Sequence, residues 1–440
     1  MDERLKVLDM MKTYYESFGC QMNAFDTEVI ESMMIASGFE TVQTAGEADV
    51  IVVNTCSVRE NAEQRAIGRL NDLSRNRAVL VVCGCMAQRM GDSLFKKVSG
   101  LSLIVGPDNY LGLVSAVISI IEGGEKNVIT EQDENAAYRL GSTSDEKDKR
   151  VSRFLSITRG CENFCSYCIV PYLRGPVRSR DIAHILHEVD ILTAAGAEEI
   201  TLLGQNVMAY NRDGIDFTGL IRHILENSDI RRLRFLTTHP RDVDKKIFQI
   251  MNEDQRLCPH IHLPFQAGSD RVLSLMGRGY TRQHYLDIVS EARKIRPDLA
   301  ITTDIIVGFP SETDADFEET LGVVRDCRFD SAFTFKYSPR EGTSAYKMDD
   351  DVSSELKKER LARLNSLVQK IRKEILESRV GLTDEILLDA RVKKGEYLFW
   401  KGRTPHFRNV LVSRADLNNG DVLQVYLTGI RNFTYIGEVV

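Results

Sequence analysis

The sequence predicts an α/β protein in three parts: an N-terminal α/β domain with a parallel sheet, a central partial (β/α)6 barrel and a small C-terminal antiparallel β-barrel. Three observations predict this order. Short β-branched runs alternate with helical patterns from Lys12 to about Thr130 and again from Phe154 onward, which is typical of βαβ units. The polar segment EQDENAAYRLGSTSDEKDK, which lacks periodicity, separates these two regions. From Gly381 onward the helical pattern stops, and short strands with turn signals follow.

These patterns set the expected boundaries. We expect an N-terminal domain at 11–129, a linker at 130–148, a barrel with its connecting helix at 149–378 and a C-terminal barrel at 379–440. In the N-terminal domain three segments share one register and each ends in a cysteine: 14–20, 50–56 and 79–85. The closed form of this barrel has eight β/α units, and this chain has six candidate strands. They lie at 154–158, 199–203, 233–237, 260–263, 300–307 and 332–337.

Composition limits the class of protein. The chain has 440 residues, of which 43% are hydrophobic and 28% charged, and its formal net charge is −7. It shows no signal peptide and no run of about 18 uninterrupted apolar residues, so we expect a cytoplasmic protein without membrane contact. In that reducing compartment the nine cysteines are expected to be metal ligands, catalytic thiols or small buried hydrophobes rather than disulfides. The negative charge means that any nucleic-acid contact must be local.

The segment CENFCSYC places Cys161, Cys165 and Cys168 within eight residues, directly after a predicted strand. Iron-sulfur clusters are normally held by four thiolates, so a trio leaves one iron free for an external ligand. In a radical-SAM enzyme that ligand is S-adenosylmethionine (SAM), which one electron from the cluster cleaves to a 5'-deoxyadenosyl radical. Zinc is the alternative, but zinc prefers four tetrahedral ligands and usually paired C-x2-C units. The sequence therefore predicts a [4Fe-4S] cluster that cleaves SAM.

Candidate SAM contacts lie in the loops after the predicted strands, because barrel enzymes build their sites at the C-terminal ends of strands. Tyr167, next to the third cysteine, is suited either to flank the adenine of SAM or to pack the loop. A buried Asp in the run ITTDIIVGF must be paired by a structural hydrogen bond or by a ligand. The candidate contacts are Tyr167, Gly204, Gln205, Asn206, Gln266 and Asp304. The histidines His239, His260 and His262 are more often core or capping residues than catalysts.

A second trio comes from the shared register of the N-terminal segments. Cys20, Cys56 and Cys85 are each expected just past the end of a parallel strand, where ligands bind in open α/β sheets. Their convergence predicts a second open [4Fe-4S] cluster, with helix N-termini that stabilise the thiolates. Cys83 aligns with Asn54 rather than with the other cysteines, so we interpret it as a small buried residue.

Motifs throughout the first two domains point to one family. They are FGCQMN, NTCSVRENAEQ, GCMAQR, RGCENFCSYCIVPYLRG, LLGQNV, HLPFQAGSDRVLSLMGRGY and TTDIIVGFPSET. In these segments the sequence resembles the bacterial tRNA methylthiotransferases of the radical-SAM class, and its C-terminal barrel resembles the TRAM RNA-binding module. GCQMN, NTCSVRENAE and GCMAQR resemble the branch acting on N6-isopentenyladenosine beside the anticodon, more than the branches acting on a ribosomal protein or on threonylcarbamoyladenosine.

The resemblance implies conversion of N6-isopentenyladenosine in tRNA to its 2-methylthio derivative. It implies that one SAM methylates a sulfur held at Cys20, Cys56 and Cys85. A second SAM, bound at Cys161, Cys165 and Cys168, would yield the radical that takes hydrogen from carbon 2 of the adenine. The cofactors are then two [4Fe-4S] clusters and SAM. The partners are tRNA and a one-electron donor such as a flavodoxin or ferredoxin, and we expect a monomer.

Three departures from the family pattern limit this transfer. Relatives often carry acidic residues after the cluster loop, where this chain has Pro176 and Val177 within RGPVRSR. Ala267 stands where a Ser is common in a Q-S-G-S loop, so a hydroxyl hydrogen bond is missing. Glu341 lies in PREGT in place of the usual R-P-G-T, which leaves a SAM role for Arg340 in doubt.

Two basic stretches are candidate RNA contacts. Between Arg391 and Arg414 seven cations accompany one acid, with aromatic residues such as Trp400 and Phe407 interleaved, a pattern expected of RNA contact on a small barrel. The alternative is that the aromatics fill the barrel core and the cations are solvated. The candidate RNA contacts are Arg391, Lys393, Lys394, Lys401, Arg403 and Arg408. A second stretch, 149–180, is basic and is expected to steer tRNA phosphates toward the radical.

Two other functions stay open from the sequence. Within the same chemistry, the target is another tRNA nucleoside or a ribosomal protein. In a different class, the chain is a non-catalytic iron-sulfur carrier or RNA-binding protein. A carrier has no need of polar loops for SAM at the ends of six strands, which favours the enzyme.

Overall fold

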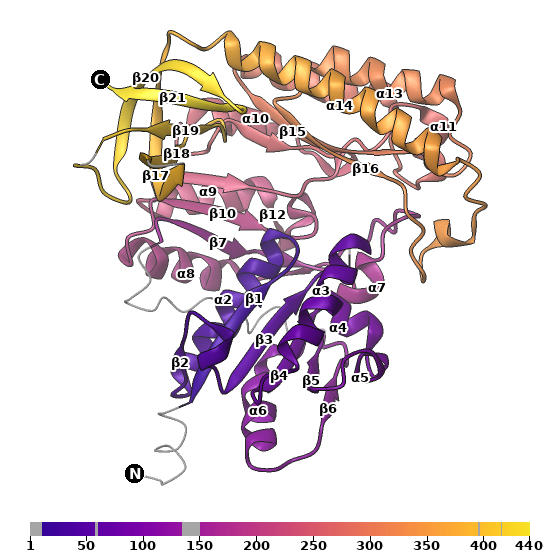
Figure 1. Ribbon diagram of the computed structural model, residues 1–440. Coiled ribbons are helices and arrows are strands. Elements are labelled where there is room, and N and C mark those ends of the chain that lie inside the picture. The colour runs from indigo at the N-terminus through magenta and orange to yellow at the C-terminus, as the bar shows by residue number, and fades with distance from the viewer. Residues whose placement is uncertain (1–10, 58–59, 134–149, 395–396, 415) are drawn as a thin grey trace.

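The computed structural model describes residues 11–57, 60–133, 150–394, 397–414 and 416–440. The predicted linker at 130–148 lies for the most part outside these residues. The α/β fold class is confirmed: a parallel sheet with helices, a partial barrel and a small closed β-barrel follow one another along the chain. Figure 1 shows the N-terminal sheet below the central barrel, with the C-terminal strands against the other end of that barrel.

The N-terminal sheet has six parallel strands in the order β2-β1-β3-β4-β5-β6. Apolar residues cover both of its faces, as expected for a parallel sheet between helices. The strands are β1 (Lys12–Ser17), β2 (Glu40–Thr41), β3 (Val50–Thr55), β4 (Val79–Gly84), β5 (Leu101–Val105) and β6 (Asn127–Ile129). The helices are α2 (Gln21–Ala36), α3 (Glu60–Leu73), α4 (Cys85–Met90), α5 (Ser93–Lys97) and α6 (Leu113–Ile121).

The predicted register holds for two of the three cysteine segments. Val50 pairs with Val79 as expected, but Ile51 pairs with Tyr14, so the predicted alignment of the first segment is wrong by one residue. The extra residue is taken up at Gly19, whose φ of +134° turns the chain before Cys20. A Cβ at Gly19 would lie 2.5 Å from the Cβ of Cys56, so glycine is required there.

The partial barrel has six parallel strands in sequence order, in two groups of three: β7-β10-β13 and β14-β15-β16. A parallel bridge between Leu233 and Leu257 joins the two groups. The strands are β7 (Ser152–Ser156), β10 (Glu199–Leu203), β13 (Arg232–Phe235), β14 (His260–His262), β15 (Ala300–Val307) and β16 (Ser331–Lys336). The outer helices are α8 (Ile182–Ala194), α9 (Phe217–Asn227), α10 (Lys246–Glu253), α12 (Arg282–Ile295), α13 (Asp314–Cys327) and α14 (Ser354–Glu377), the predicted connecting helix.

The C-terminal strands form a closed barrel in the order β17-β18-β19-β21-β20. Its pairs are antiparallel except for β19 with β21, which run parallel. Trp400 is buried in its core beside Ile386 and Tyr435. The strands are β17 (Thr383–Lys394), β18 (Tyr397–Arg403), β19 (Asn409–Val412), β20 (Val422–Arg431) and β21 (Thr434–Val439). No helix in the described part of the chain is long and apolar enough to span a membrane.

The loop 404–408 fixes this barrel to the N-terminal ends of the central strands. Arg234 of β13 donates hydrogen bonds to the carbonyl oxygens of Thr404 (2.8 Å) and Pro405 (2.7 Å). The Phe407 ring stacks on His260 at the start of β14, with 4.7 Å between ring centroids. His406 pairs with Asp298 at 2.8 Å. The C-terminal barrel therefore closes the end of the central barrel opposite to the cysteine loop.

Candidate active site

The first cysteine trio lies in a loop that is closed at its base. Two short strands, β8 (Thr158–Arg159) and β9 (Arg178–Ser179), pair antiparallel on either side of it. Gly160 has φ +85°, and a Cβ there would lie 1.8 Å from the carbonyl oxygen of Pro176, so glycine is needed where the loop begins. Cys161 donates its N–H to Gly175 (3.1 Å), which fixes the start of the loop to its end.

The thiols of this loop are partly or fully buried. Burial raises the pKa of Cys161 and raises that of Cys168 to about 12. Arg278, itself buried, opposes this effect and donates a hydrogen bond to Cys165 Sγ (3.3 Å) and one to the carbonyl oxygen of Pro264 (2.8 Å). Because burial disfavours thiolates, three of them here require bound positive charge, which iron supplies. The donor set therefore fits an iron-sulfur cluster.

In the described residues, no three His, Cys, Asp or Glu side chains converge on a point that could hold a single metal ion. In a [4Fe-4S] cluster each thiolate binds a different iron, so the thiols surround the cluster rather than meet at one atom.

Two of the predicted SAM loops lie beside the cysteine loop. Gln205 Oε1 accepts a hydrogen bond from the N–H of Gly160, one residue before Cys161. Asn206 is buried and donates to Asp242 (2.6 Å). A Cβ at Gly204 would lie 2.1 Å from Thr158 Oγ1, so this loop needs glycine to approach β8. The β10 loop and the cysteine loop therefore form one wall of the site.

The other predicted SAM residues lie at the β14–β15 end. Gln266 donates its N–H to the carbonyl oxygen of Asp304 (2.9 Å), and its own carbonyl accepts from Ile306 (2.9 Å). The sequence predicted that Asp304 is buried, and this prediction is wrong. Its side chain is 28% exposed and lies 3.5 Å from His262 Nε2, because residues 302, 304 and 306 of β15 alternate with the buried residues that pack on the outer helices.

Tyr167 packs its ring against the apolar group that includes Ala267 and Phe309. Its hydroxyl accepts a hydrogen bond from Arg278 (3.4 Å). These contacts favour the packing interpretation of Tyr167. Ala267 is buried in the same group, at the position where the family pattern carries a hydroxyl group.

The second trio also comes together in the structure. Cys20 precedes α2 and donates from Sγ to Asn23 Oδ1 (3.2 Å). Cys56 follows β3, and a Cβ at Gly19 would lie 3.2 Å from its Sγ. Cys85 begins α4 and is buried. Cys83, in contrast, lies in register with Asn54 and is buried in the apolar core, as predicted.

The two trios meet across one interface. Cys85 packs against Ile169 and Leu173, which come directly after the first cysteine loop. Leu173 lies in α7 (Val170–Arg174) and Ile169 directly precedes this helix. Figure 1 shows α7 beside α4. The N-terminal sheet therefore presents its cysteines to the cluster loop of the barrel.

A buried carboxylate joins the two sides. Asp26 of α2 is fully buried and forms ion pairs with Arg159, just before the first trio, and with Arg174 Nη2 (3.0 Å), just after it. Tyr110 donates its hydroxyl to Asp26 (3.3 Å). Arg178 likewise forms a two-fold pair with Asp108 of the N-terminal part (3.0 Å each).

These pairs correct the prediction for the basic stretch 149–180. Arg159, Arg174, Arg178 and Arg180 are all buried and ion-paired, so the interpretation that they steer tRNA phosphates is wrong. The arginines neutralise carboxylates inside the protein. Pro176 and Val177 lie between the two arginines that hold Asp26 and Asp108.

A second carboxylate, Glu63, contacts Ser57, the residue after Cys56. Ser57 donates to Glu63, which also accepts from Arg89 Nη2 (3.0 Å) and from Arg340 Nη1 (3.2 Å). Arg340 comes from the loop after β16, so this ion pair again joins the barrel to the N-terminal part. The contact gives Arg340 a structural role, where the sequence left a role in SAM binding in doubt. Its neighbour Glu341 is exposed.

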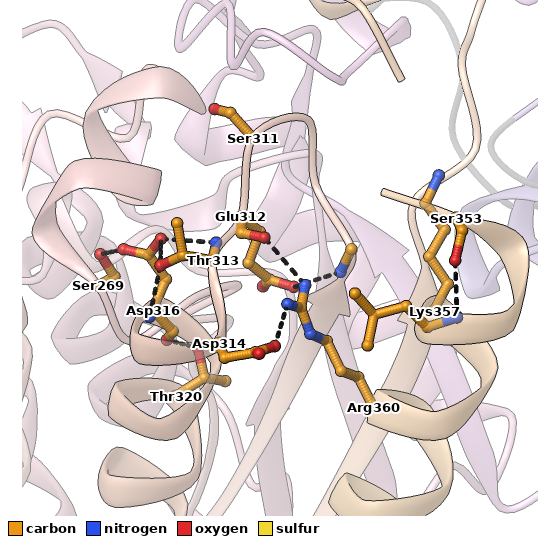
Figure 2. A network of polar contacts seen from close by, with 12 residues as sticks. Ser269, Ser311, Glu312, Thr313, Asp314, Asp316, Thr320, Ser353, Lys357 and Arg360 are labelled. Atoms are coloured by element: carbon orange, nitrogen blue, oxygen red, sulfur yellow. Dashed lines mark hydrogen bonds and ion pairs between the residues drawn. The ribbon is translucent and has the colours of Figure 1, made fainter. Parts of the chain in front are cut away.

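The polar loop after β15 makes most of its hydrogen bonds within the protein, although Oε1 of Glu312 is buried and has no partner in the described residues. Figure 2 shows Glu312 between the loop and α14. Its carboxylate accepts from the N–H of Gly308 (2.6 Å) and from Arg360 Nη1 (2.8 Å), and Arg360 Nη2 donates to Asp314 (2.7 Å). Lys357 of α14 covers Gly308, where a Cβ would lie 2.3 Å from Lys357 Cγ.

The start of α13 is fixed in the same network (Figure 2). Thr313 and Asp316 form a capping box, in which each side chain accepts from the backbone of the other residue. Ser269 also donates to Asp316, so the loops after β14 and β15 are held together.

The predicted RNA contacts divide into two groups. Arg391 and Lys393 are exposed, and the Arg391 guanidinium lies over the Trp400 ring at 4.5 Å. Arg403 and Arg408 instead form ion pairs within the chain, with Asp389 (3.0 Å) and Asp330 (2.6 Å). Lys401 is half-buried, and the side chain of Lys394 lies outside the described residues.

Sequence reasoning missed Arg278 and gave two other arginines of the site different roles, Arg174 as a phosphate contact and Arg340 as a doubtful SAM contact. Arg278 binds Cys165, Arg174 donates to Cys85 Sγ (3.3 Å), and Arg340 reaches Glu63. A signal was available for Arg174, which lies in the cysteine motif RGCENFCSYCIVPYLRG, whereas Arg278 and Arg340 lie in motifs without cysteine. The comparison with the family pattern concerned the carboxylates that the cluster loop lacks, and it did not consider the arginines that the loop contains.

Known proteins are similar to this chain in both its N-terminal part and its central barrel. The family model described as the Radical SAM superfamily matches residues 155–324, and the one described as Uncharacterized protein family UPF0004 matches residues 12–106. The tRNA-2-methylthio-N(6)-dimethylallyladenosine synthase of Phocaeicola vulgatus is 42% identical over 98% of this chain and 96% of its own length. The enzyme of the same name from Natranaerobius thermophilus is 37% identical over 97% of this chain and 96% of its own length.

Solved structures share the fold. The radical SAM methyltransferase TsrM from Kitasatospora setae, with cobalamin and a [4Fe-4S] cluster bound, has a TM-score of 0.56 at 14% identity and covers 74% of this chain and 75% of its own. The cobalamin-dependent radical enzyme OxsB has a TM-score of 0.54 at 12% identity, covering 83% of this chain and 57% of its own.

Fold and site together define a radical-SAM enzyme, a class that uses a [4Fe-4S] cluster and SAM. Relatives that match nearly the whole length of the chain narrow this class to one family. The chain belongs to the family of tRNA-2-methylthio-N(6)-dimethylallyladenosine synthases, which confirms the predicted resemblance.

Proposed function

We propose that this chain converts N6-isopentenyladenosine in tRNA, also called N6-dimethylallyladenosine, to its 2-methylthio derivative. It would use one SAM as methyl donor and one as radical source. The observation that carries the proposal is the meeting of two cysteine trios at one interface, where Cys85 packs on Ile169 and Leu173. The name of relatives that match nearly the whole chain supports the substrate.

The proposal assigns a cluster to each trio. Cys161, Cys165 and Cys168 would hold the cluster that binds SAM, and Cys20, Cys56 and Cys85 would hold the second. When bound, the two clusters supply an electron that cleaves SAM and a sulfur for methylation and transfer. The protein's own part is to hold thiolates in a buried site, which Arg278 and Arg174 assist by hydrogen bonds to Cys165 and Cys85.

The SAM contacts are proposed on the two walls of the barrel mouth. Gly204, Gln205 and Asn206 lie on the wall that carries the cysteine loop, and Gln266 and Asp304 lie together on the other. The carboxylate of Asp304 is partly exposed and lies on the face of β15 opposite to the buried residues, where a polar ligand group can reach it.

The tRNA is proposed to approach through the C-terminal barrel. Arg391 and Lys393 are exposed cations on that barrel, and Arg391 covers an aromatic ring. Such surfaces bind nucleic-acid phosphates with a strong salt dependence. The target base has to leave its stack to reach the cysteine site. A one-electron donor such as a flavodoxin or ferredoxin and a monomeric state complete the proposal.

The decisive experiment uses the full chain, reconstituted with iron and sulfide under anaerobic conditions. It is incubated with reductant, SAM and tRNA that carries isopentenyladenosine, and the nucleosides are analysed by mass spectrometry. We expect the 2-methylthio nucleoside, with 5'-deoxyadenosine and S-adenosylhomocysteine as co-products. The same tRNA without the isopentenyl group is the substrate control. Absence of any methylthio product would reject the proposal, and methylthiolation of a different nucleoside would redirect it to another target.

The chain offers a matched pair of cysteines for the two-cluster assignment. Cys85→Ala is expected to abolish the methylthio product, whereas Cys83→Ala, two residues away in the apolar core, should retain it. Two four-iron clusters predict about eight iron atoms per chain. Replacement of either trio by alanine should leave about four iron atoms. Replacement of Cys20, Cys56 and Cys85 without loss of iron would contradict the second cluster.

A further inference from the structure

Arg174 connects the cluster loop of the barrel to a cysteine of the other trio. It is the last residue of α7, which begins two residues after Cys168, yet its Nε donates to Sγ of Cys85 at 3.3 Å. Its Nη2 donates to Asp26 at 3.0 Å. Arg174 is 3% exposed, so both contacts are shielded from water.

The third nitrogen of this guanidinium is unused. Nη1 of Arg174 is buried and has no hydrogen-bond partner in the described residues. A buried donor without an acceptor costs free energy, and one in a native site indicates a ligand or ion that accepts it. The charged groups that act on Arg174 include Cys85 and Cys20, so the unused donor belongs to the second cysteine site.

The charges around Arg174 favour an anionic acceptor. Arg174 donates from Nε to Cys85 Sγ, and a cation that donates a hydrogen bond to sulfur favours its anionic form. Asp26 balances only part of the positive charge, because it is shared between Arg174 and Arg159. Two buried arginines and one carboxylate leave this side of the site positive.

We propose that Arg174 stabilises anionic sulfur in the second cysteine site. Nε holds the Cys85 thiolate, and Nη1 donates to sulfur that binds there. Since α7 follows the first cluster loop directly, the same arginine also sets the position of one trio relative to the other. Arg174 is thus a positioning residue that acts on sulfur. The inference rests on the proposed function, because it needs Cys20, Cys56 and Cys85 to hold a cluster.

The proposal predicts the sign of a change in reduction potential. A reduced cluster carries more negative charge, so a buried cation and hydrogen bonds to sulfur raise the potential. Arg174→Met keeps much of the packing volume and removes both effects, so the potential should become more negative. Arg174→Lys keeps the charge but loses the planar donor group, and it should fall between Met and the unchanged chain. Asp26→Asn leaves the arginines without their carboxylate and should shift the potential in the positive direction.

Arg178→Met is the matched control. Arg178 is in the same loop, is 7% exposed and pairs with Asp108 across the same interface, but its hydrogen bonds are with Asp108, Asp133 and Arg174 rather than with a cysteine. Its loss removes a buried ion pair from the same interface without removing a donor to sulfur. The control should therefore leave the potential unchanged.

The experiment uses the full chain with Cys161, Cys165 and Cys168 replaced by alanine, so that only the second site can hold iron. Iron content is measured after reconstitution, and the potential is measured by titration followed by electron paramagnetic resonance. No iron in this background would overturn the proposed second cluster. With iron bound, equal potentials for the Arg174→Met and Arg178→Met chains would overturn the role of Arg174. A shift of Arg174→Met and Asp26→Asn in the same direction would also overturn it.

Discussion

The pair between Arg360 and Glu312 allows a prediction of stability whose size follows from the contacts. Arg360 is 2% exposed, and the Glu312 side chain is fully buried. Arg360→Met would keep an apolar side chain at this position but would remove the guanidinium, which lies over Phe317 and donates three hydrogen bonds, to the Glu312 carboxylate, the Glu312 carbonyl and Asp314. Removing one partner of a buried ion pair costs about 3–5 kcal/mol, because the other charge stays buried. For a unit the size of the barrel this corresponds to a fall in Tm of about 6–20 °C.

The assay is thermal unfolding of the full chain, followed by circular dichroism. Arg363→Met is the control, because Arg363 lies one turn along α14 and pairs with Glu318 at the surface, where both side chains are about half exposed. Such pairs contribute about 0–1 kcal/mol. The double variant Arg360→Met with Glu312→Gln should regain most of the loss, since a neutral amide can still accept from Gly308. Equal falls in Tm for Arg360→Met and Arg363→Met would refute the reasoning.

Three further predictions concern pH, the C-terminal barrel and RNA. Burial, with Arg278 and Arg241, lowers the pKa of His239 to about 2, so below pH 6.5 the unfolded chain binds a proton that the folded chain does not. The free energy of unfolding should therefore fall by about 1 kcal/mol between pH 6.5 and 5.5 through this group, and the fall in Tm should be less steep in His239→Asn. Phe407→Ala should cost about 2 kcal/mol by removing the stack on His260, whereas Leu398→Ala, 57% exposed, should leave Tm within about 1 °C. Arg391→Gln with Lys393→Gln should weaken tRNA binding and reduce the slope of log Kd against log salt by about 0.7–0.9 per lost phosphate contact. Lys358→Gln with Lys370→Gln, which removes two exposed charges from α14, should not change that slope. Unchanged slopes in both pairs would remove the RNA role of the C-terminal barrel.

The backbone was predictable because the periodicities were unambiguous. All six barrel strands lie within two residues of the expected ranges, since helical patterns separate them along the chain. The one error of register, at the first cysteine segment, came from Gly19. A turn with positive φ adds a residue after β1, and no pattern of apolar residues reports that.

The cysteines were predictable, but their surroundings were not. Spacing predicted the first trio and strand register predicted the second. That each trio holds a cluster stays a prediction. The sequence does not distinguish a solvated arginine from a buried one, since its charge is the same in both. Arg159, Arg174 and Arg178 looked like a surface for phosphates, and their acidic partners Asp26 and Asp108 lie more than fifty residues away in the chain. Pairing over such distances depends on tertiary structure, which local patterns do not contain.

Loop 404–408 attaches the C-terminal barrel to the end of the central barrel opposite to the cysteine loop. This attachment fixes the distance between the C-terminal barrel and the cysteines. The stack of Phe407 on His260 and the bonds from Arg234 leave the C-terminal barrel no free swing relative to the strands that lead to the cysteines. A domain on a flexible tether would sample many separations from the site. Under the proposed RNA role, the separation between the exposed cations of β17 and the cysteine loop would be fixed, and only a base at the matching distance from the bound backbone would reach the site.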